Sequence, residues 1–264
     1  MKRNRLRAGI QVILMLLVIV MLGFSLYQIV CIRMDYKEAE DKVEDLRKVH
    51  EQTEDDESEN RDCSGSELPV DAGLLKLHEQ NEDCVAWISI EDTEIDYPVM
   101  LHPSEKDYYL HRDFDGEYSS SGCLYFAEDC NLEHSDNLLI YGHHMKNGSM
   151  FGNLEKYKDA SFWEEHSVIH METLTGPRDY KIIAVFTSPV YTGHDYEYYS
   201  FINALDKSEY DDYVAEAKSR SLYDTGLTAD YGEQLLTLST CEYSQKNGRM
   251  VVVAKQITRG GVVE

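Results

Sequence analysis

The sequence of 264 residues predicts a mainly β protein, a closed antiparallel barrel of eight strands with an N-terminal helix and an inserted helix between strands 6 and 7. Eight short runs rich in apolar and β-branched residues, separated by turn-rich joints, predict the barrel, because a βαβ sheet would alternate strands with helices. The expected strands are residues 85–90, 95–100, 123–127, 137–143, 168–174, 180–187, 235–241 and 250–257.

Two segments of the folded domain carry helical spacing instead. Residues 72–80 place Leu74, Leu75 and Leu77 within two turns, which predicts a short amphipathic helix ahead of the first strand. Residues 208–222 interrupt the strand pattern, since their apolar positions recur every three or four residues. These positions are Tyr210, Tyr213, Val214 and Ala217. We therefore expect one helix inserted late in the barrel.

The N-terminus predicts a membrane anchor. Residues 1–9 form a basic tail, and residues 10–32 contain no charged side chain. As a helix, this run would span about 33 Å at about 1.5 Å per residue, enough to cross a bilayer. No small-residue cleavage site follows it, so we expect an uncleaved signal anchor. Basic residues stay in the cytoplasm, which predicts a single-pass protein with an extracellular catalytic domain.

Residues 33–69 are expected to connect the anchor to a domain of residues 70–264. Between residues 35 and 67, 14 Asp or Glu stand against 5 Lys or Arg. Residues 35–50 have loosely helical apolar spacing and would continue the membrane helix as a stalk. Residues 51–66 predict a solvated linker, because such acidic runs serve more often as spacers than as binding surfaces.

The overall charge and the motifs exclude several classes of function. A net charge of −24 argues against a nucleic-acid partner, which would need a basic face. The chain has no CxxC, HExxH or Gly-rich phosphate loop, so neither a metal nor a nucleotide cofactor is expected. Of six cysteines, only Cys31 lies in the apolar run. Five remain, so at least one is unpaired or pairs between chains. The oxidation state of the other four stays open: Cys63, Cys84, Cys123 and Cys130.

A cysteine and an arginine are predicted to face each other across one hairpin. Residues 235–239 read as a buried strand that runs into Cys241, and Arg249 begins the next strand after a polar, Gly-containing loop. A thiol needs a nearby cation to form a thiolate, and an acyl-transfer oxyanion needs a fixed donor. The alternative is that Cys241 is an ordinary buried thiol.

His143 is the second candidate. It emerges where the buried strand of residues 138–141 ends, after Gly142, which would permit an unusual turn. A general acid or base needs this presentation, fixed by a strand and open to substrate. The alternatives are a structural histidine or half of a metal pair, but the side chains of His143 and His144 would point to opposite faces of a strand.

These motifs resemble the sortase family, specifically class B. TLSTC followed eight residues later by Arg, with an upstream YGHHM-x-x-G-x-M-F, carries the resemblance. CVAWISIEDTEIDYPVM and DYYLHRDFDGEYSSSGCLYF resemble the family's opening segments, and the inserted helix is a class B feature. The resemblance covers about residues 70–258. It implies that Cys241 is the nucleophile, His143 the general acid/base and Arg249 the oxyanion-side arginine.

The resemblance also implies substrate contacts near the reacting carbonyl, at Leu110, Tyr141, Ser239, Thr240 and Glu242. It gives no catalytic role to His144. Some family members carry Asp two residues after the cysteine, whereas this chain has Tyr243, which favours Cys-His-Arg over a Cys-His-Asp triad.

The function implied is transpeptidation in a Gram-positive cell wall: a thiol protease that cleaves an NPQTN-like C-terminal sorting motif of secreted proteins and passes them to a peptidoglycan amine. Three alternatives stay open. A pilin-polymerising sortase would use a pilin lysine as acceptor. A hydrolytic cysteine protease generally needs Asn or Asp to orient its histidine, and no such motif is present. A non-catalytic membrane-tethered binding module would not need Cys, His and Arg together.

Overall fold

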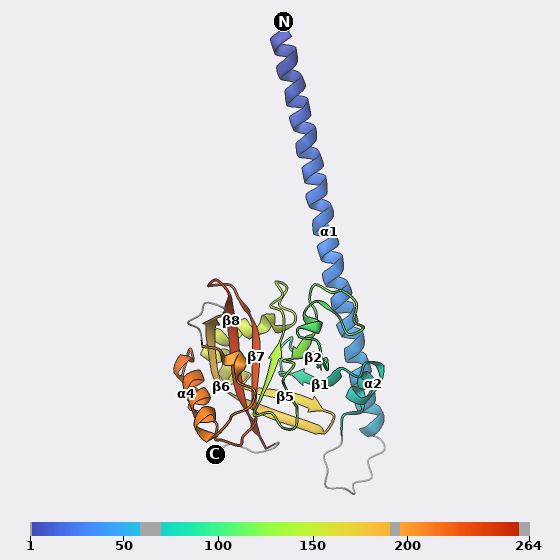
Figure 1. Cartoon of the computed structure of the whole chain (residues 1–264). Helices are drawn as coiled ribbons and strands as arrows, with labels where there is room; N and C mark the ends of the chain where they lie inside the picture. The colour runs from blue at the N-terminus through green and yellow to red at the C-terminus, as the bar shows by residue number, and fades with distance from the viewer. Residues whose placement is uncertain (1, 59–69, 191–195, 259–264) are drawn as a thin grey trace. The chain divides into compact units, whose positions relative to one another are not determined.

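The computed structural model describes residues 2–58, 70–190 and 196–258, and its largest feature is a closed eight-stranded barrel (Figure 1). Around the barrel the strands follow the order β1-β2-β3-β4-β7-β8-β6-β5. Their bounds are β1 Cys84–Ser89, β2 Asp96–Met100, β3 Leu124–Phe126, β4 Asn137–Tyr141, β5 Val168–Thr173, β6 Gly176–Pro189, β7 Leu235–Glu242 and β8 Gly248–Ile257. The predicted closed barrel is confirmed, and each strand lies within a few residues of its expected position.

The barrel is not antiparallel throughout. β2 pairs with β3 in parallel, and β4 pairs with β7 in parallel, while the other six pairings are antiparallel. A parallel pair needs a crossover connection rather than a tight hairpin. The β4–β7 pair has one, because the whole of β5, β6 and the inserted helix lies between these strands in the chain. The parallel pairing decides where the site residues meet.

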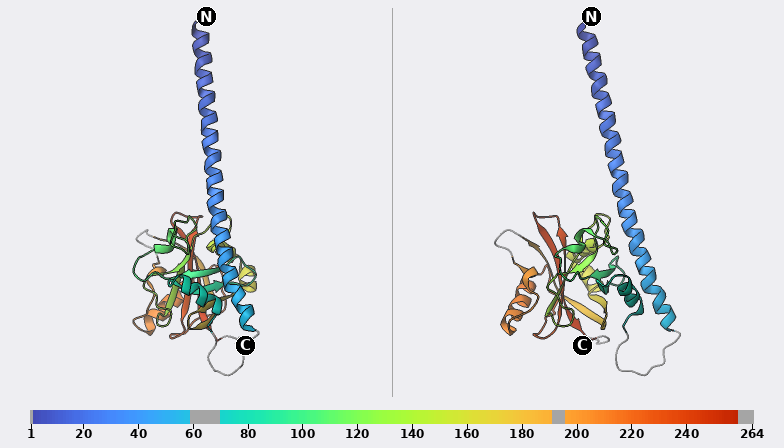
Figure 2. Two further views of the ribbon diagram at one scale, coloured as in Figure 1. Left: turned by 90° about the vertical axis from the view of Figure 1, so that its right-hand side faces the viewer. Right: turned by 45° about the vertical axis from the view of Figure 1, so that its right-hand side comes forward.

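Two predicted helices are present beside the barrel. α2 (Ala72–Gln80) begins at Asp71, whose carboxylate caps it by accepting from the Leu74 N–H at 2.6 Å. α4 (Lys207–Arg220) is the inserted helix between β6 and β7, and it lies along β6 (Figure 2). Its buried residues are the ones expected from the spacing: Tyr210, Tyr213, Val214 and Ala217. Three 3-10 helices, η1 (Tyr108–His111), η2 (Phe151–Lys158) and η3 (Tyr198–Ser200), and α3 (Ala160–Glu165) occupy connections.

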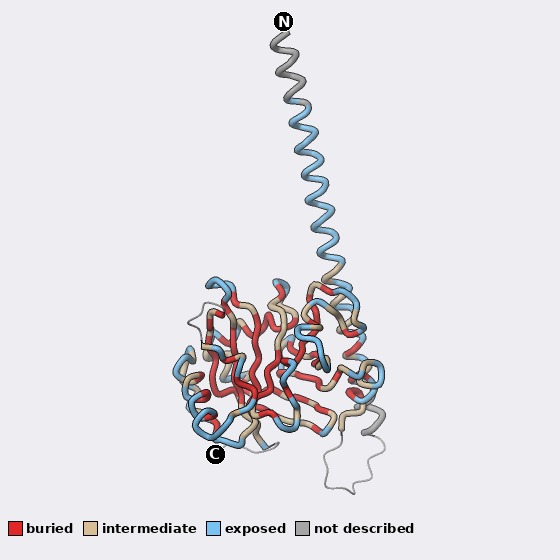
Figure 3. Tube along the Cα trace, in the orientation of Figure 1, coloured by how far each residue is buried: buried red, intermediate tan, exposed pale blue. Residues whose placement is uncertain are grey.

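The core follows the strands, whose backbone is buried almost continuously in β4, β7 and β8 (Figure 3). Every residue of β7 from Leu235 to Thr240 is buried. Strands covered on both faces read as continuous apolar runs, which is why Leu235–Glu242 and the valines of β8 show little alternation. Cys241 is the one residue of β7 that is partly exposed. The strand is therefore a rigid support that opens to solvent at the position of the thiol.

α1 (Lys2–Ser58) is one continuous helix, so the expected stalk is helical and the helix continues to Ser58 rather than ending at residue 50. The remainder of the predicted linker lies outside the described residues. By length and composition, the helix from Ile13 is apolar enough to cross a membrane. The compact unit that contains the barrel begins at Val43, ahead of the expected boundary at residue 70.

Residues 43–50 belong to that unit through specific contacts. Arg47 Nε lies 3.0 Å from Asp96 Oδ2 and donates to the Asp96 carbonyl at 2.9 Å. The His50 ring stacks on Trp87, with centroids 4.2 Å apart, and its Nε2 lies 3.2 Å from Asp71 Oδ1. Because these contacts are polar as well as apolar, they fix the register of the helix against β1 and β2.

Four of the described cysteines are free thiols: Cys31, Cys84, Cys130 and Cys241. Burial raises the pKa of Cys84 to about 12 and that of Cys130 to about 11, so both are protonated at neutral pH. Cys63 lies outside the described residues. Among the described thiols of the barrel unit, only Cys241 is not buried.

Candidate active site

The site residues meet because β4 and β7 run in parallel. Tyr141, the last residue of β4, pairs with Ser239 of β7, so the chain after β4 and the end of β7 leave the barrel at the same edge. Two further hydrogen bonds continue the pairing: the Gly142 N–H donates to the Ser239 carbonyl at 3.2 Å, and Thr240 Oγ1 donates to the Gly142 carbonyl at 2.8 Å. This register brings His143 level with Cys241.

Gly142 serves a different purpose from the one expected. Its backbone is not left-handed; instead, a Cβ there would lie 2.3 Å from Leu124 Cδ2 and 2.7 Å from Phe151 Cδ2. Leu124 and Phe151 are fully buried and have no space to move. Glycine is therefore required because β3 and η2 approach the end of β4 closely, and this packing fixes the backbone that carries His143.

Cys241 and Arg249 are direct cross-strand partners in the antiparallel β7–β8 pair. Side chains of such a pair lie on the same face of the sheet, with Cβ atoms about 4.5–5.5 Å apart. Arg249 Nη1 donates to the Gly248 carbonyl at 3.0 Å, and no salt bridge of Arg249 is found within residues 2–58, 70–190 and 196–258. The predicted pairing across the hairpin is present, and the guanidinium keeps donors available.

His143 is held by the backbone of η1. Its Nε2 lies 2.8 Å from the carbonyl oxygen of Leu110, and its ring stacks on that of His111 with centroids 5.2 Å apart. A carbonyl oxygen only accepts, so Nε2 carries the proton and Nδ1 is the nitrogen left for chemistry. Among the described residues, no hydrogen bond joins His143 to Cys241.

The surroundings of His143 favour its neutral form. Burial lowers the pKa of His143 below 6.5, the carbonyl of Leu110 acts in the opposite sense, and the neighbouring His111 lowers it further. The imidazole is therefore mostly neutral at pH 7 and can accept a proton before it donates one.

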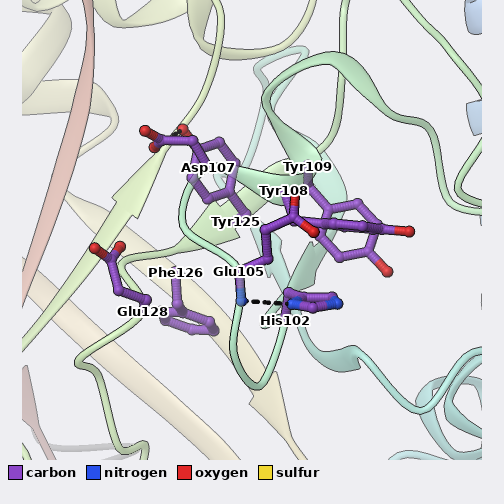
Figure 4. A pocket seen from close by; sticks show the side chains of 8 residues that line it. All are labelled: His102, Glu105, Asp107, Tyr108, Tyr109, Tyr125, Phe126 and Glu128. Carbon is purple, nitrogen blue, oxygen red and sulfur yellow. Dashed lines mark hydrogen bonds between the residues drawn. The ribbon is translucent and has the colours of Figure 1, made fainter.

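η1 is itself fixed at its N-terminal end, beside a small pocket that Figure 4 shows from close by. Ahead of the helix, His102 Nδ1 accepts the Glu105 N–H at 2.9 Å and its ring stacks on Tyr108, with centroids 4.1 Å apart. The Tyr125 hydroxyl donates to Asp107 Oδ1 at 2.9 Å. These contacts anchor the short helix to β3, so the Leu110 carbonyl has a defined position.

No motif in the sequence indicates that His144 contacts the backbone of Cys241. Its Nδ1 donates to the Cys241 carbonyl at 2.9 Å, and its ring lies beside Tyr243, with centroids 5.2 Å apart. The Tyr243 hydroxyl in turn donates to the His144 carbonyl at 3.4 Å. His144 and Cys241 are 97 positions apart in the chain, so only the tertiary structure reveals this contact. His144 thus contacts the backbone of Cys241, and this hydrogen bond occupies its Nδ1.

The five residues expected to contact substrate fall into two groups. Leu110 and Tyr141 are partly exposed, whereas Ser239 and Thr240 are buried and their hydroxyls are already bonded. Ser239 Oγ lies 2.8 Å from the Tyr198 hydroxyl of η3, on the face of β7 that also carries Cys241. The segment between β6 and β7 thus contacts β7 two residues before Cys241. The carboxylate of Glu242 is buried against Lys158, with Oε1 2.8 Å from Nζ.

Within the ranges that the structure describes, no group of three or more His, Cys, Asp or Glu side chains is placed to hold a metal ion. The polar groups at this end of the barrel are a thiol, an imidazole and a guanidinium from three different segments. Their arrangement suits acyl transfer through a cysteine nucleophile with a fixed cationic donor.

Comparison with known proteins identifies the family of the chain. The Sortase domain family profile matches residues 88–257. Sortase B of Listeria monocytogenes is 35% identical over 189 residues, which cover 70% of this chain and 74% of that protein. Sortase B of Staphylococcus aureus is 29% identical over 258 residues, covering 96% and 98%. The solved structure of a Staphylococcus aureus sortase B–substrate complex superimposes with a TM-score of 0.75 at 26% identity, covering 86% of this chain and 100% of that one.

The matched region runs from the last two residues of β1 to the end of β8 and includes all three candidate catalytic positions. The fold and the sequence relationships point to the same class within the family. The chain therefore belongs to the sortase family of cysteine transpeptidases, as a class B sortase.

Proposed function

We propose that this sortase is anchored in the cell membrane, cleaves an NPQTN-like C-terminal sorting motif of secreted proteins through a thioacyl-enzyme, and transfers them to a cell-wall amine. The observation that carries the proposal is the pairing of Cys241 with Arg249, level with His143 across the β4–β7 pair. Arg249 supplies a cation and donors, and Nδ1 of His143 makes no hydrogen bond to the residues that the structure describes. The similarity to a solved sortase B–substrate complex supports a bound substrate on this fold.

In the first half-reaction, the Cys241 thiol gives its proton to Nδ1 of His143, and the sulfur attacks the carbonyl carbon of the scissile peptide bond. Arg249 and a backbone N–H stabilise the oxyanion of the tetrahedral intermediate. The intermediate collapses as the C–N bond breaks, and Nδ1–H protonates the departing amine. A neutral resting His143, as its lowered pKa indicates, fits this order, because it must accept the proton that it later donates.

In the second half-reaction, a primary amine attacks the thioester, gives a proton to Nδ1 of His143, and releases the Cys241 sulfur, which recovers a proton from the imidazolium. Transfer competes with hydrolysis, so the amine needs a bound position close to the thioester. We infer that the acceptor belongs to a peptidoglycan precursor or cross-bridge. Leu110 and Tyr141 are partly exposed and are proposed substrate contacts. Ser239, Thr240 and Glu242 would contribute through their backbone, since their side chains are buried.

The test uses the full chain in detergent micelles with a fluorogenic NPQTN peptide and triglycine as the acceptor. Mass spectrometry should detect an acyl adduct on Cys241 and a peptide–triglycine product, and Cys241→Ala should abolish both while the far-ultraviolet circular dichroism stays unchanged. Turnover by Cys241→Ala would refute the assignment of the nucleophile. Transfer only to a lysine side chain would identify a pilin-polymerising enzyme instead, and binding without cleavage would identify a tethered binding module.

A further inference from the structure

The carboxylate of Glu242, directly after the nucleophile, is enclosed by three donors. Its side chain is 1% exposed. Oε1 accepts from Lys158 Nζ at 2.8 Å and from the Ser244 N–H at 2.9 Å, and Oε2 accepts from the Ser244 hydroxyl at 2.8 Å. A buried carboxylate is costly unless donors surround it, and here they do. The side chain therefore has no free oxygen pointing to solvent for a substrate group.

Lys158 is the partner that comes from another part of the fold. It ends η2, and its ammonium also pairs with Glu155 one turn earlier. Burial acts to raise the pKa of Glu242, but the hydrogen bonds from Lys158 and Ser244 outweigh it and hold the pKa below its ordinary value. Burial acts to lower the pKa of Lys158, and its two carboxylate partners outweigh that effect. Both groups are therefore charged at neutral pH.

The pair lies against the closing end of the β7–β8 hairpin. Glu242 pairs with Gly248, where a Cβ would lie 2.6 Å from the Glu242 carbonyl oxygen and 2.8 Å from its Oε2. Strand alternation places the Glu242 side chain on the face opposite to Cys241 and Arg249. The ion pair therefore supports the strand from behind, without entering the reacting face.

Residues on both sides of the nucleophile are tied to other elements in the same way. Thr240 Oγ1 donates to the Gly142 carbonyl at 2.8 Å, and His144 Nδ1 donates to the Cys241 carbonyl at 2.9 Å. With Lys158 on Glu242, three consecutive residues of β7 are held from outside the β7–β8 pair. Such multiple support is what a nucleophile needs when a displacement of about 1 Å costs about 10²-fold in rate.

We propose that Lys158 and Glu242 form a positioning pair, which sets the Cys241 sulfur against Arg249 and His143, and that the Glu242 carboxylate does not bind substrate. This inference rests on the proposed role of Cys241 as nucleophile. A positioning pair acts on the transition state, so its loss should lower kcat and leave KM nearly constant, whereas loss of a substrate contact should raise KM.

The experiment compares full-chain variants in detergent with the sorting peptide and triglycine: Lys158→Met, Lys158→Arg, Glu242→Gln and the double variant Lys158→Met/Glu242→Gln. Lys158→Met leaves Glu242 buried without its cation, and we expect kcat to fall by about 10- to 100-fold with KM within about twofold. Lys158→Arg should restore most of kcat. The double variant should be no slower than Lys158→Met, because the neutral Gln no longer needs a cation.

Lys255→Met is the matched control. Lys255 forms a partly buried ion pair with Glu233, Nζ to Oε1 3.1 Å, near the other end of β8. Its loss removes another Lys–Glu ion pair from the same sheet, one with a more exposed carboxylate, and should leave kcat unchanged. Equal kcat in Lys158→Met and Lys255→Met, or a raised KM at constant kcat in Glu242→Gln, would overturn the inference. Failure of the proposed function is recognised separately, by turnover in Cys241→Ala measured in the same assay.

Discussion

The carbonyl oxygen of Leu110 lies 2.8 Å from Nε2 of His143, although the two residues are 33 positions apart in the chain. This contact places the proton on Nε2, so a short 3-10 helix decides which nitrogen of the imidazole is left to accept a proton. The orientation of the proposed general acid/base therefore depends on η1, a segment outside the β4, β7 and β8 strands that lead to the three candidate residues.

We predict that His143→Ala abolishes turnover, whereas His144→Ala lowers it by about 10-fold. His143 has a free Nδ1, while Nδ1 of His144 is used to hold the Cys241 carbonyl. Loss of a neutral hydrogen bond of this kind typically costs about 0.5–1.5 kcal/mol, which is a change of about 2- to 13-fold. Steady-state assays with the sorting peptide measure both variants, and the reverse ranking would show that the acid/base is His144.

We predict that His111→Gln raises the pKa of His143. His111 stacks on His143 and acts to lower its pKa, so a neutral amide should let it return toward 6.5. Nuclear magnetic resonance titration of ¹³C-labelled histidine measures this pKa directly. In the wild type, a lowered pKa means that stability from neutral His143 is present above pH 6.5 and is lost as pH falls through the folded pKa. An unchanged His143 pKa in His111→Gln would contradict the prediction.

We predict that Gly122→Ala impairs catalysis by displacing the carbonyl that orients His143. A Cβ at Gly122 would lie 2.4 Å from the Leu110 oxygen and 2.5 Å from the Tyr109 oxygen. The backbone bearing Leu110 must then shift, and the hydrogen bond to Nε2 weakens. We expect kcat to fall by at least about 10-fold in protein that remains folded by circular dichroism.

Gly226→Ala is the control for this variant. Gly226 has a similar positive φ of 69°, against 56° for Gly122, but a Cβ there meets nothing within 4 Å. Both substitutions carry the cost of a left-handed alanine, about 1–3 kcal/mol, so both should lower the midpoint of thermal unfolding. Only Gly122→Ala should lower kcat, and an equal loss in Gly226→Ala would show that backbone strain alone explains it.

We predict that Arg249→Lys is nearly as inactive as Arg249→Ala. Arg249 is the direct partner of Cys241, and its guanidinium provides donors in a planar fork that a lysine ammonium does not reproduce. Loss of one oxyanion donor costs about 10²- to 10³-fold in kcat. Peptide turnover and the pH dependence of Cys241 alkylation separate two roles of Arg249: donation of hydrogen bonds to the oxyanion, and lowering of the thiol pKa by its charge. Near wild-type turnover in Arg249→Lys, with a raised thiol pKa only in Arg249→Ala, would assign to Arg249 a purely electrostatic role.

We predict that the barrel lies outside the cell membrane. Four basic residues precede the apolar run: Lys2, Arg3, Arg5 and Arg7. Because basic residues keep that end in the cytoplasm, the remainder of the chain is expected outside the membrane. Protease added to intact protoplasts should release a soluble fragment that contains Cys241, detected by mass spectrometry. Protection of the whole chain until the membrane is permeabilised would reverse the orientation.

The sequence by itself determined the strand positions, the helix at Ala72–Gln80 and the inserted helix, because apolar periodicity and turn residues are local signals. It also singled out Cys241 and Arg249 as partners, since a short hairpin leaves few alternatives for pairing. The catalytic roles of these residues and of His143 stay predictions. The acidic run after the anchor suggested an unstructured linker from residue 51, whereas α1 continues to Ser58.

Only the tertiary structure decided that β4 and β7 pair in parallel and thereby bring His143 level with Cys241. A buried, continuously apolar strand carries no signal of its partner or direction, because every register buries the same surface. The contacts that orient the site are likewise non-local: Leu110 to His143, His144 to Cys241, and Lys158 to Glu242. Each joins a charged or polar group to a partner chosen by packing, and polar residues in loops have many possible partners until the barrel closes around them.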